Sequence, residues 1–185
     1  MAVVVHDSSG DLEVTNLASA EVSDSSGGIE LRDIAGPVVI PRDSSGDIYM
    51  ERVGDVTIQV DSSGEIEIRE ADSVTIANDT SGDIIIRQIR GSVLIGNDSS
   101  GAISARDVDG DLIVEKYTSG GISYERRPGQ VVVGGDAVEP DVAHQEGRDL
   151  RDHVAVGLKV SGIHDSAPFA GQPSSGAHLE WESIR

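Results

Sequence analysis

The chain has 185 residues and a formal charge of −19, because 33 acidic residues outnumber 14 basic ones. Binding to nucleic acid or to an anionic membrane surface needs clustered Lys and Arg, so this balance argues against both kinds of partner. The absence of cysteine excludes disulfides, thiolate catalysis and cysteine-ligated metal sites. No apolar run approaches the ~20 residues of a transmembrane helix, so membrane insertion is not expected.

An Asp-Ser-Ser-Gly turn, or a close variant of it, recurs along the first 120 residues at intervals of 17 to 19 residues. The turn glycines are Gly10, Gly27, Gly46, Gly64, Gly82, Gly101 and Gly120. Repetition at a short, fixed period is typical of solenoids, in which each unit buries its apolar face against its neighbours.

Each repeat contains two short segments in which apolar and polar residues alternate. Ile66 and Ile68 follow one turn glycine, for example, and Val74 and Ile76 repeat the pattern in the second half of the same unit. Period-two alternation of β-branched residues predicts strands with one buried face. The sequence therefore predicts an all-β fold, a parallel β-solenoid with two short strands per ~18-residue coil and about seven coils. It would occupy residues 1–133.

An apolar residue precedes the half-way corner of each coil, and we expect these residues to plug that edge of the core. They are Leu17, Ile34, Val53, Ala71, Ile89 and Val108. The outward positions of the first strand in each coil mix Glu and Arg, as in Glu30, Arg32 and Glu51. Such rows are usually a solvated face with weak cross-strand ion pairs.

The turn aspartates should form one stacked row along the other corner. The row contains Asp7, Asp24, Asp43, Asp61, Asp79 and Asp98, and Tyr117 replaces the acid in the last coil. Asp and Ser side chains in turns commonly accept hydrogen bonds from nearby backbone amides, which is the favoured interpretation. The alternative is calcium held by Asp24, Asp43, Asp61, Asp79 and Asp98, since stacked carboxylates repel one another and a hard cation would relieve this. The glycine pattern of calcium-binding β-rolls is missing, so no metal site or other cofactor is favoured.

The outward row of the second strand is apolar or threonine almost throughout. Its central members are Val39, Thr57, Thr75, Leu94, Ile113 and Val132. A flat strip of this kind seldom stays bare, so we expect another copy of the chain, the C-terminal segment or a partner to cover it. An ice-binding face is a further alternative, although only Thr57 and Thr75 are adjacent threonines.

No enzymatic constellation is found. The histidines, which include His6, His144 and His153, have no metal-ligand spacing, and there is no nucleophile elbow, phosphate loop or dinucleotide fingerprint. The repeats carry no insertion that could build a cleft. The sequence thus predicts a protein without catalytic residues.

The repeat pattern stops near Gly134, and residues 134–185 are rich in Gly, Pro and acidic residues. This composition predicts a weakly ordered segment, or one that folds back on the solenoid. Residues 153–160 alternate as a strand would and could cap the last coil, and Trp181 could act as an anchor. At the other end the repeat is under way by Val3, without a signal peptide; truncation of an upstream part is the favoured explanation, and end-to-end stacking is the alternative.

The alternation of Ser-Gly-Asp-Ile-x-Ile with Gly-Asp-Val-x-Ile, as in residues 45–58, resembles the bacterial adhesin-like family of β-strand-repeat cell-envelope proteins. The resemblance covers residues 3–133. It implies a location in the cell envelope or outside the cell, and it implies no catalytic residues. The expected function is a scaffold for adhesion or assembly that contacts a protein, a surface or further copies of itself, with a repetitive calcium-binding or ice-binding array as the alternative.

Overall fold

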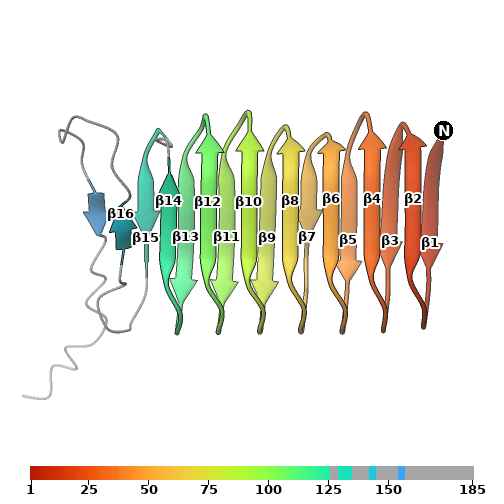
Figure 1. Cartoon of the computed structure of the whole chain (residues 1–185), viewed down its shortest axis with the longest axis horizontal. Coiled ribbons are helices and arrows are strands. Elements are labelled where there is room, and N and C mark those ends of the chain that lie inside the picture. Colours follow the sequence, from red (N-terminus) through yellow and green to blue (C-terminus); the bar gives the residue numbers. More distant parts are fainter. Residues whose placement is uncertain (126–128, 135–141, 145–153, 157–185) are drawn as a thin grey trace, which may run out of the picture.

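The computed structural model describes residues 1–125, 129–134, 142–144 and 154–156. The described residues form strands and turns only, and they wind into a parallel β-solenoid with two strands per coil, as predicted from the repeat (Figure 1). The strands of the first half are β1 (Ala2–His6), β2 (Leu12–Leu17), β3 (Ser19–Ser23), β4 (Ile29–Ile34), β5 (Val38–Arg42), β6 (Ile48–Val53), β7 (Val56–Ile58) and β8 (Ile66–Ala71). The others are β9 (Val74–Asp79), β10 (Ile84–Ile89), β11 (Val93–Asp98), β12 (Ile103–Val108), β13 (Leu112–Tyr117), β14 (Ile122–Glu125), β15 (Val131–Val133), β16 (Val142–His144) and β17 (Val154–Val156).

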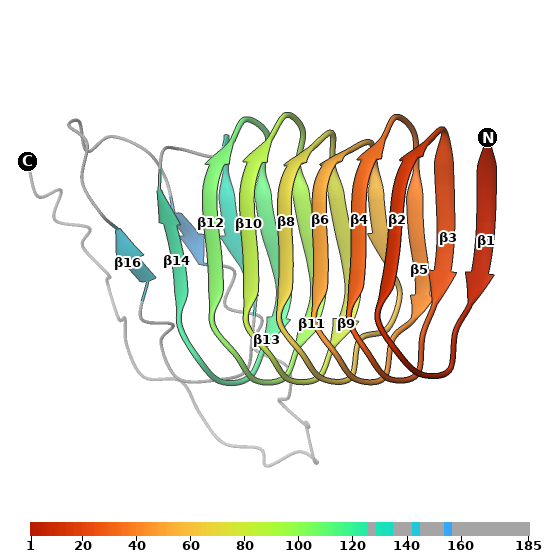
Figure 2. The same cartoon turned by 45° about the vertical axis from the view of Figure 1, so that its right-hand side comes forward.

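The strands divide into two sheets that form the two broad faces of the rod (Figure 2). The odd-numbered strands make one sheet, here called the odd sheet, in the order β1-β3-β5-β7-β9-β11-β13-β15-β17. The even-numbered strands make the even sheet, which runs from β2 to β16 in the same stepwise manner. Every strand therefore pairs with its equivalents in the neighbouring coils, because the repeat places the same residue types at the same height in each coil.

The core consists of ladders of aliphatic side chains between the two sheets. Ile48, Ile66, Ile84 and Ile103 pair directly across successive even strands, and each is at most 1% exposed. Burial of an aliphatic side chain contributes about 1.5–3 kcal/mol, so these ladders supply the main stabilisation in a chain that has few aromatic residues.

The half-way corners confirm the predicted plugs, of which Ile34, Val53, Ala71, Ile89 and Val108 are buried and Leu17 is half-buried. A feature that the sequence did not reveal lies one residue earlier. Six residues there adopt the left-handed backbone conformation, with φ between 54° and 59°: Asn16, Asp33, Arg52, Glu70, Gln88 and Asp107. This conformation interrupts the alternation, so that two successive side chains face outward and the next one turns into the core.

The pairing continues beyond the residues where the sequence repeat ends. β16 pairs in parallel with β14, and β17 pairs in parallel with β15. β17 lies within the candidate strand 153–160 and pairs with the edge of the odd sheet next to β15. Residue 153, residues 157–160 and Trp181 lie outside the described residues.

Candidate functional site

The aspartates of the Asp-Ser-Ser-Gly turns are buried inside the rod. Asp43, Asp61, Asp79 and Asp98 have no exposed surface, and Asp24 is 3% exposed. Backbone pairing sets Asp61 beside Asp79 and Asp79 beside Asp98, which confirms a stacked row for these three residues. The row runs along the corner that joins each odd strand to the next even strand, at the lower edge of Figure 1.

The first two turns show the predicted capping by aspartate. Asp24 Oδ1 accepts hydrogen bonds from the backbone N–H of Ser25 at 2.6 Å and of Ser26 at 3.3 Å. Asp7 Oδ1 is bonded in the same way to the two residues that follow it. The interpretation of the aspartate as a turn-forming residue is therefore confirmed at these two positions.

From the second turn onward, the second serine of the turn connects adjacent coils. Its hydroxyl donates to a backbone carbonyl in the turn of the preceding coil, at distances of 3.1 to 3.2 Å. The donors are Ser26, Ser45, Ser63, Ser81, Ser100 and Ser119. The serine row is therefore a structural tie along the corner, and its hydroxyls are engaged with the backbone.

Burial raises the pKa of the carboxyl groups in the middle of the row. The pKa of Asp61 rises to about 7, first because of burial and then because of the charges of Asp79 and Asp43. The pKa values of Asp79 and Asp98 rise to about 6, with burial again the largest cause. Nearby backbone amides oppose the rise, but no carboxylate oxygen of Asp43, Asp61, Asp79 or Asp98 forms a hydrogen bond of good geometry.

The five calcium candidates are these buried residues, so their carboxylates do not form a cation-binding edge open to solvent. Calcium takes six to eight oxygen ligands, usually including water. Within the described part of the chain, no three His, Cys, Asp or Glu side chains converge in a way that could hold a metal ion. The repeated aspartate is therefore a buried residue of the turn.

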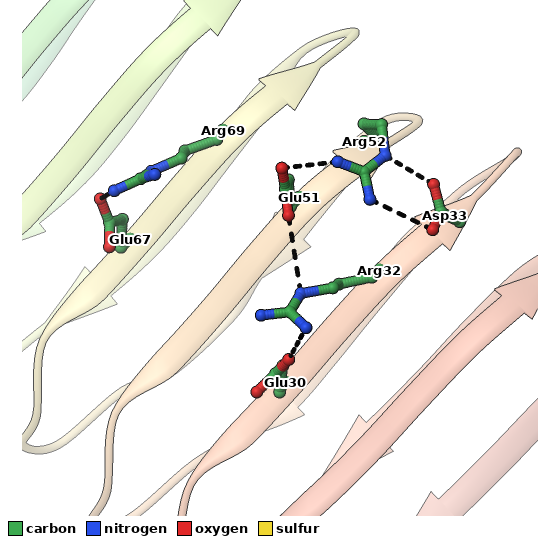
Figure 3. Close-up of polar contacts among 7 residues, drawn as sticks. All are labelled: Glu30, Arg32, Asp33, Glu51, Arg52, Glu67 and Arg69. Atoms are coloured by element: carbon green, nitrogen blue, oxygen red, sulfur yellow. Dashed lines mark hydrogen bonds and ion pairs between the residues drawn. The ribbon is translucent and has the colours of Figure 1, made fainter.

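The outer face of the even sheet carries a network of ion pairs (Figure 3). Arg52 binds Asp33 through two nitrogens at 2.6 and 3.2 Å and also contacts Glu51. Arg32 lies between Glu51 and Glu30, which extends the network along the sheet. The Arg52 hydrogen bonds lower the pKa of Asp33. These groups are exposed or half-exposed, so each pair contributes at most about 1 kcal/mol, as expected for a solvated face.

Three arginines stand in register further along the same face: Arg69, Arg87 and Arg106. Glu67 lies 3.5 Å from Arg87 and also pairs with Arg69, whereas Arg106 contacts Glu125 at 2.7 Å. Acidic partners accompany the whole row, so this face does not present a free cationic surface.

The outer face of the odd sheet carries the strip predicted as an interaction surface. Its residues align in direct register from β5 to β15: Val39, Thr57, Thr75, Leu94, Ile113 and Val132. All six are half-exposed, and Val4, in the same row at the end of the sheet, is 61% exposed. β17 joins the sheet edge next to β15, so this strand does not lie across the strip.

Sequence reasoning found the strip and the aspartate row but missed the burial of the aspartates. Strict alternation after the inward Ile76 would place Asp79 outward, but two successive outward residues separate them in the structure, so Asp79 faces the core. His6 is exposed, and His153, His164 and His178 fall outside the described residues.

The chain matches no family model, no curated protein and no solved structure. The described residues contain no helix that is long and apolar enough to cross a bilayer.

Proposed function

We propose that this β-solenoid is a non-enzymatic scaffold of the cell envelope that acts in adhesion or assembly through the strip on its odd sheet. The single observation that carries this proposal is the alignment of six uncharged side chains, from Val39 to Val132, in one register across six parallel strands. The resemblance to β-strand-repeat envelope proteins supports the location.

The contrast between the two faces supports the odd sheet as the contact surface. The even face is occupied by ion pairs that are well solvated, and desolvating them would be costly. The strip has no charged member between Val39 and Val132, so covering it removes apolar surface from water without burying a charge. A contact is therefore favoured on the odd face.

The occupant that fits best is a second copy of the chain. The strip repeats at the strand spacing of ~4.8 Å, and only another β-face with the same spacing matches it side chain for side chain along its length. A second copy related by a two-fold axis supplies such a face, and the contact is then the same on both chains.

The proposal is tested by size-exclusion chromatography with light scattering over a range of concentrations. We expect the unaltered chain to dimerise and the Leu94→Asp/Ile113→Asp variant to remain monomeric, because four like charges would face one another in the dimer. The matched control is Ile85→Asp/Ser104→Asp, which makes the same kind of change at paired positions of the even face. The control should dimerise normally.

A chain that is monomeric at every concentration would contradict the second copy as occupant. Dimerisation of the Leu94→Asp/Ile113→Asp variant at the unaltered level would contradict the strip as the contact surface. Circular dichroism on each variant verifies that the β-fold is retained.

A further inference from the structure

A line of carboxyl groups runs inside the Asp-Ser-Ser-Gly corner. Asp24, Asp43, Asp61, Asp79 and Asp98 occupy the same place in five successive coils and are at most 3% exposed. Strands in a sheet are ~4.8 Å apart, so the carboxyl groups of Asp43, Asp61 and Asp79 each have another carboxyl group as a neighbour on both sides, whereas Asp98 has Tyr117 on one side. In the last four of them neither oxygen forms a hydrogen bond of good geometry with the described residues, and the nearby amides of the same turn only partly offset the effect of burial.

The charges that act on this row are themselves acidic. Asp43 and Asp79 act on Asp61, and Asp98 acts on Asp79. From the turn that leads into the even sheet, Asp83 acts on Asp98. No cation therefore contributes to the charge effects that perturb these four residues.

Neither sheet places a buried positive charge beside the aspartate row. On the odd sheet, Arg42 and Lys116 precede row positions but are exposed. On the even sheet, the strands that follow the turns begin with buried isoleucines, such as Ile66 and Ile84. The row ends at Tyr117, whose hydroxyl donates to the Gly101 carbonyl at 3.4 Å.

An ionised carboxylate without a partner is costly inside a protein, and stacked ionised carboxylates are costlier still. Two carboxyl groups that share one proton avoid both costs, because the protonated group donates a hydrogen bond to the ionised one. We propose that four of these aspartates, Asp43, Asp61, Asp79 and Asp98, form a proton-sharing row, which makes the rod most stable in mildly acidic solution and weakens the corner as the pH rises through neutrality.

The direction of the pH dependence follows from proton binding. The folded chain keeps protons on Asp61, Asp79 and Asp98 up to a pKa of about 6 to 7, whereas the ordinary value is 3.8. A raised pKa in the folded state gives stability that is complete below the ordinary value and is lost as the pH rises through the folded value. The loss should therefore extend from about pH 4 to about pH 7.

The test is thermal unfolding of the full chain at constant ionic strength between pH 5 and pH 8, followed by circular dichroism. We expect the melting temperature to fall by ~5 °C or more across this range. In the variant Asp61→Asn/Asp79→Asn, which carries neutral amides at every pH, most of this fall should disappear. The matched control is Asp47→Asn/Asp109→Asn, which removes two charges at exposed positions and should retain the fall.

Carbon-13 NMR titration of the aspartate carboxyl groups in the unaltered chain provides a second measurement, which does not depend on whether the variant folds. We expect the Asp61, Asp79 and Asp98 signals to titrate well above pH 5. Titration of these three groups near pH 4, or a melting temperature that is constant or rises between pH 5 and pH 8, would overturn the proposal. An equal loss of pH dependence in both double variants would assign the effect to net charge and overturn it as well.

Discussion

The turn glycine is the residue on which the stacking of coils depends most. Gly27, Gly46 and Gly64 have φ between 125° and 132°, a region that residues with a side chain rarely adopt. In these turns a Cβ atom would also overlap the carbonyl oxygen of the turn glycine in the preceding coil. The glycine is thus required twice, once by its own backbone and once by the neighbouring coil.

The two requirements can be separated by comparing Gly64→Ala with Gly10→Ala. Gly10 has a φ of 108°, but nothing lies within 4 Å of its Cβ position. We expect Gly10→Ala to cost only the strain of the backbone, about 1–3 kcal/mol. Gly64→Ala should cost more, because the corner of the preceding coil must also move. Urea unfolding of both variants measures the difference, and equal losses would contradict a role for close stacking.

At the scale of the strand, the even strands from β2 to β12 share a left-handed residue just before the plug. The left-handed residue before each plug is Asn or Asp in Asn16, Asp33 and Asp107, types that tolerate this conformation. Arg52, Glu70 and Gln88 adopt it as well, although such residues pay about 1–2 kcal/mol for it. The stacked backbone therefore imposes the conformation on residues that do not favour it.

Replacing one of these residues by glycine should stabilise the rod. Gln88→Gly removes the strain of the left-handed conformation but increases the entropy of the unfolded chain, and we expect a net gain of about 0.5–1 kcal/mol. Ser104→Gly is the control, since Ser104 lies within β12 outside the positive-φ positions, and this variant should lower the free energy of unfolding by about 0.5–1 kcal/mol. Thermal unfolding distinguishes the two variants. Destabilisation by both of them would contradict the claim that the backbone of Gln88 is strained.

The strands themselves were predictable, whereas these bends were not. Alternation of Ile66, Glu67, Ile68 and Arg69 predicts a strand with one buried face, and the structure has β8 there. Glu70 gives no sign of a left-handed backbone, because Glu is not among the residue types that favour it. The bend depends on the neighbouring coils, which repeat it at the same height.

For the whole molecule, stability is distributed along the rod by nearest-neighbour contacts. Leu12 and Ile66 occupy equivalent positions in β2 and β8, within one continuous register of the even sheet. Ile66 has coils on both sides and no exposed surface, whereas Leu12 lies in the first even strand and is half-exposed. An aliphatic side chain should therefore contribute more to the free energy of unfolding at position 66 than at position 12.

We expect Ile66→Ala to lower the free energy of unfolding by about 3–4 kcal/mol, because it leaves a cavity between two sheets. Leu12→Ala should lower it by only about 1–2 kcal/mol, since that side chain is only partly removed from water. Equilibrium denaturation with urea measures both values. Similar losses at the two positions would argue against stability that is built coil upon coil.

The sequence by itself determined the period, the strands and the inward ladders, because a repeated alternation of β-branched residues can bury its apolar face only by stacking. It also identified the strip from Val39 to Val132, since outward positions follow directly from the alternation. The tertiary structure alone decided that Asp61 and its equivalents are buried, that the second serines tie one coil to the next, and that the chain bends through left-handed residues before each plug. These features depend on contacts between coils about 18 residues apart, and the residue types of a single turn do not specify them.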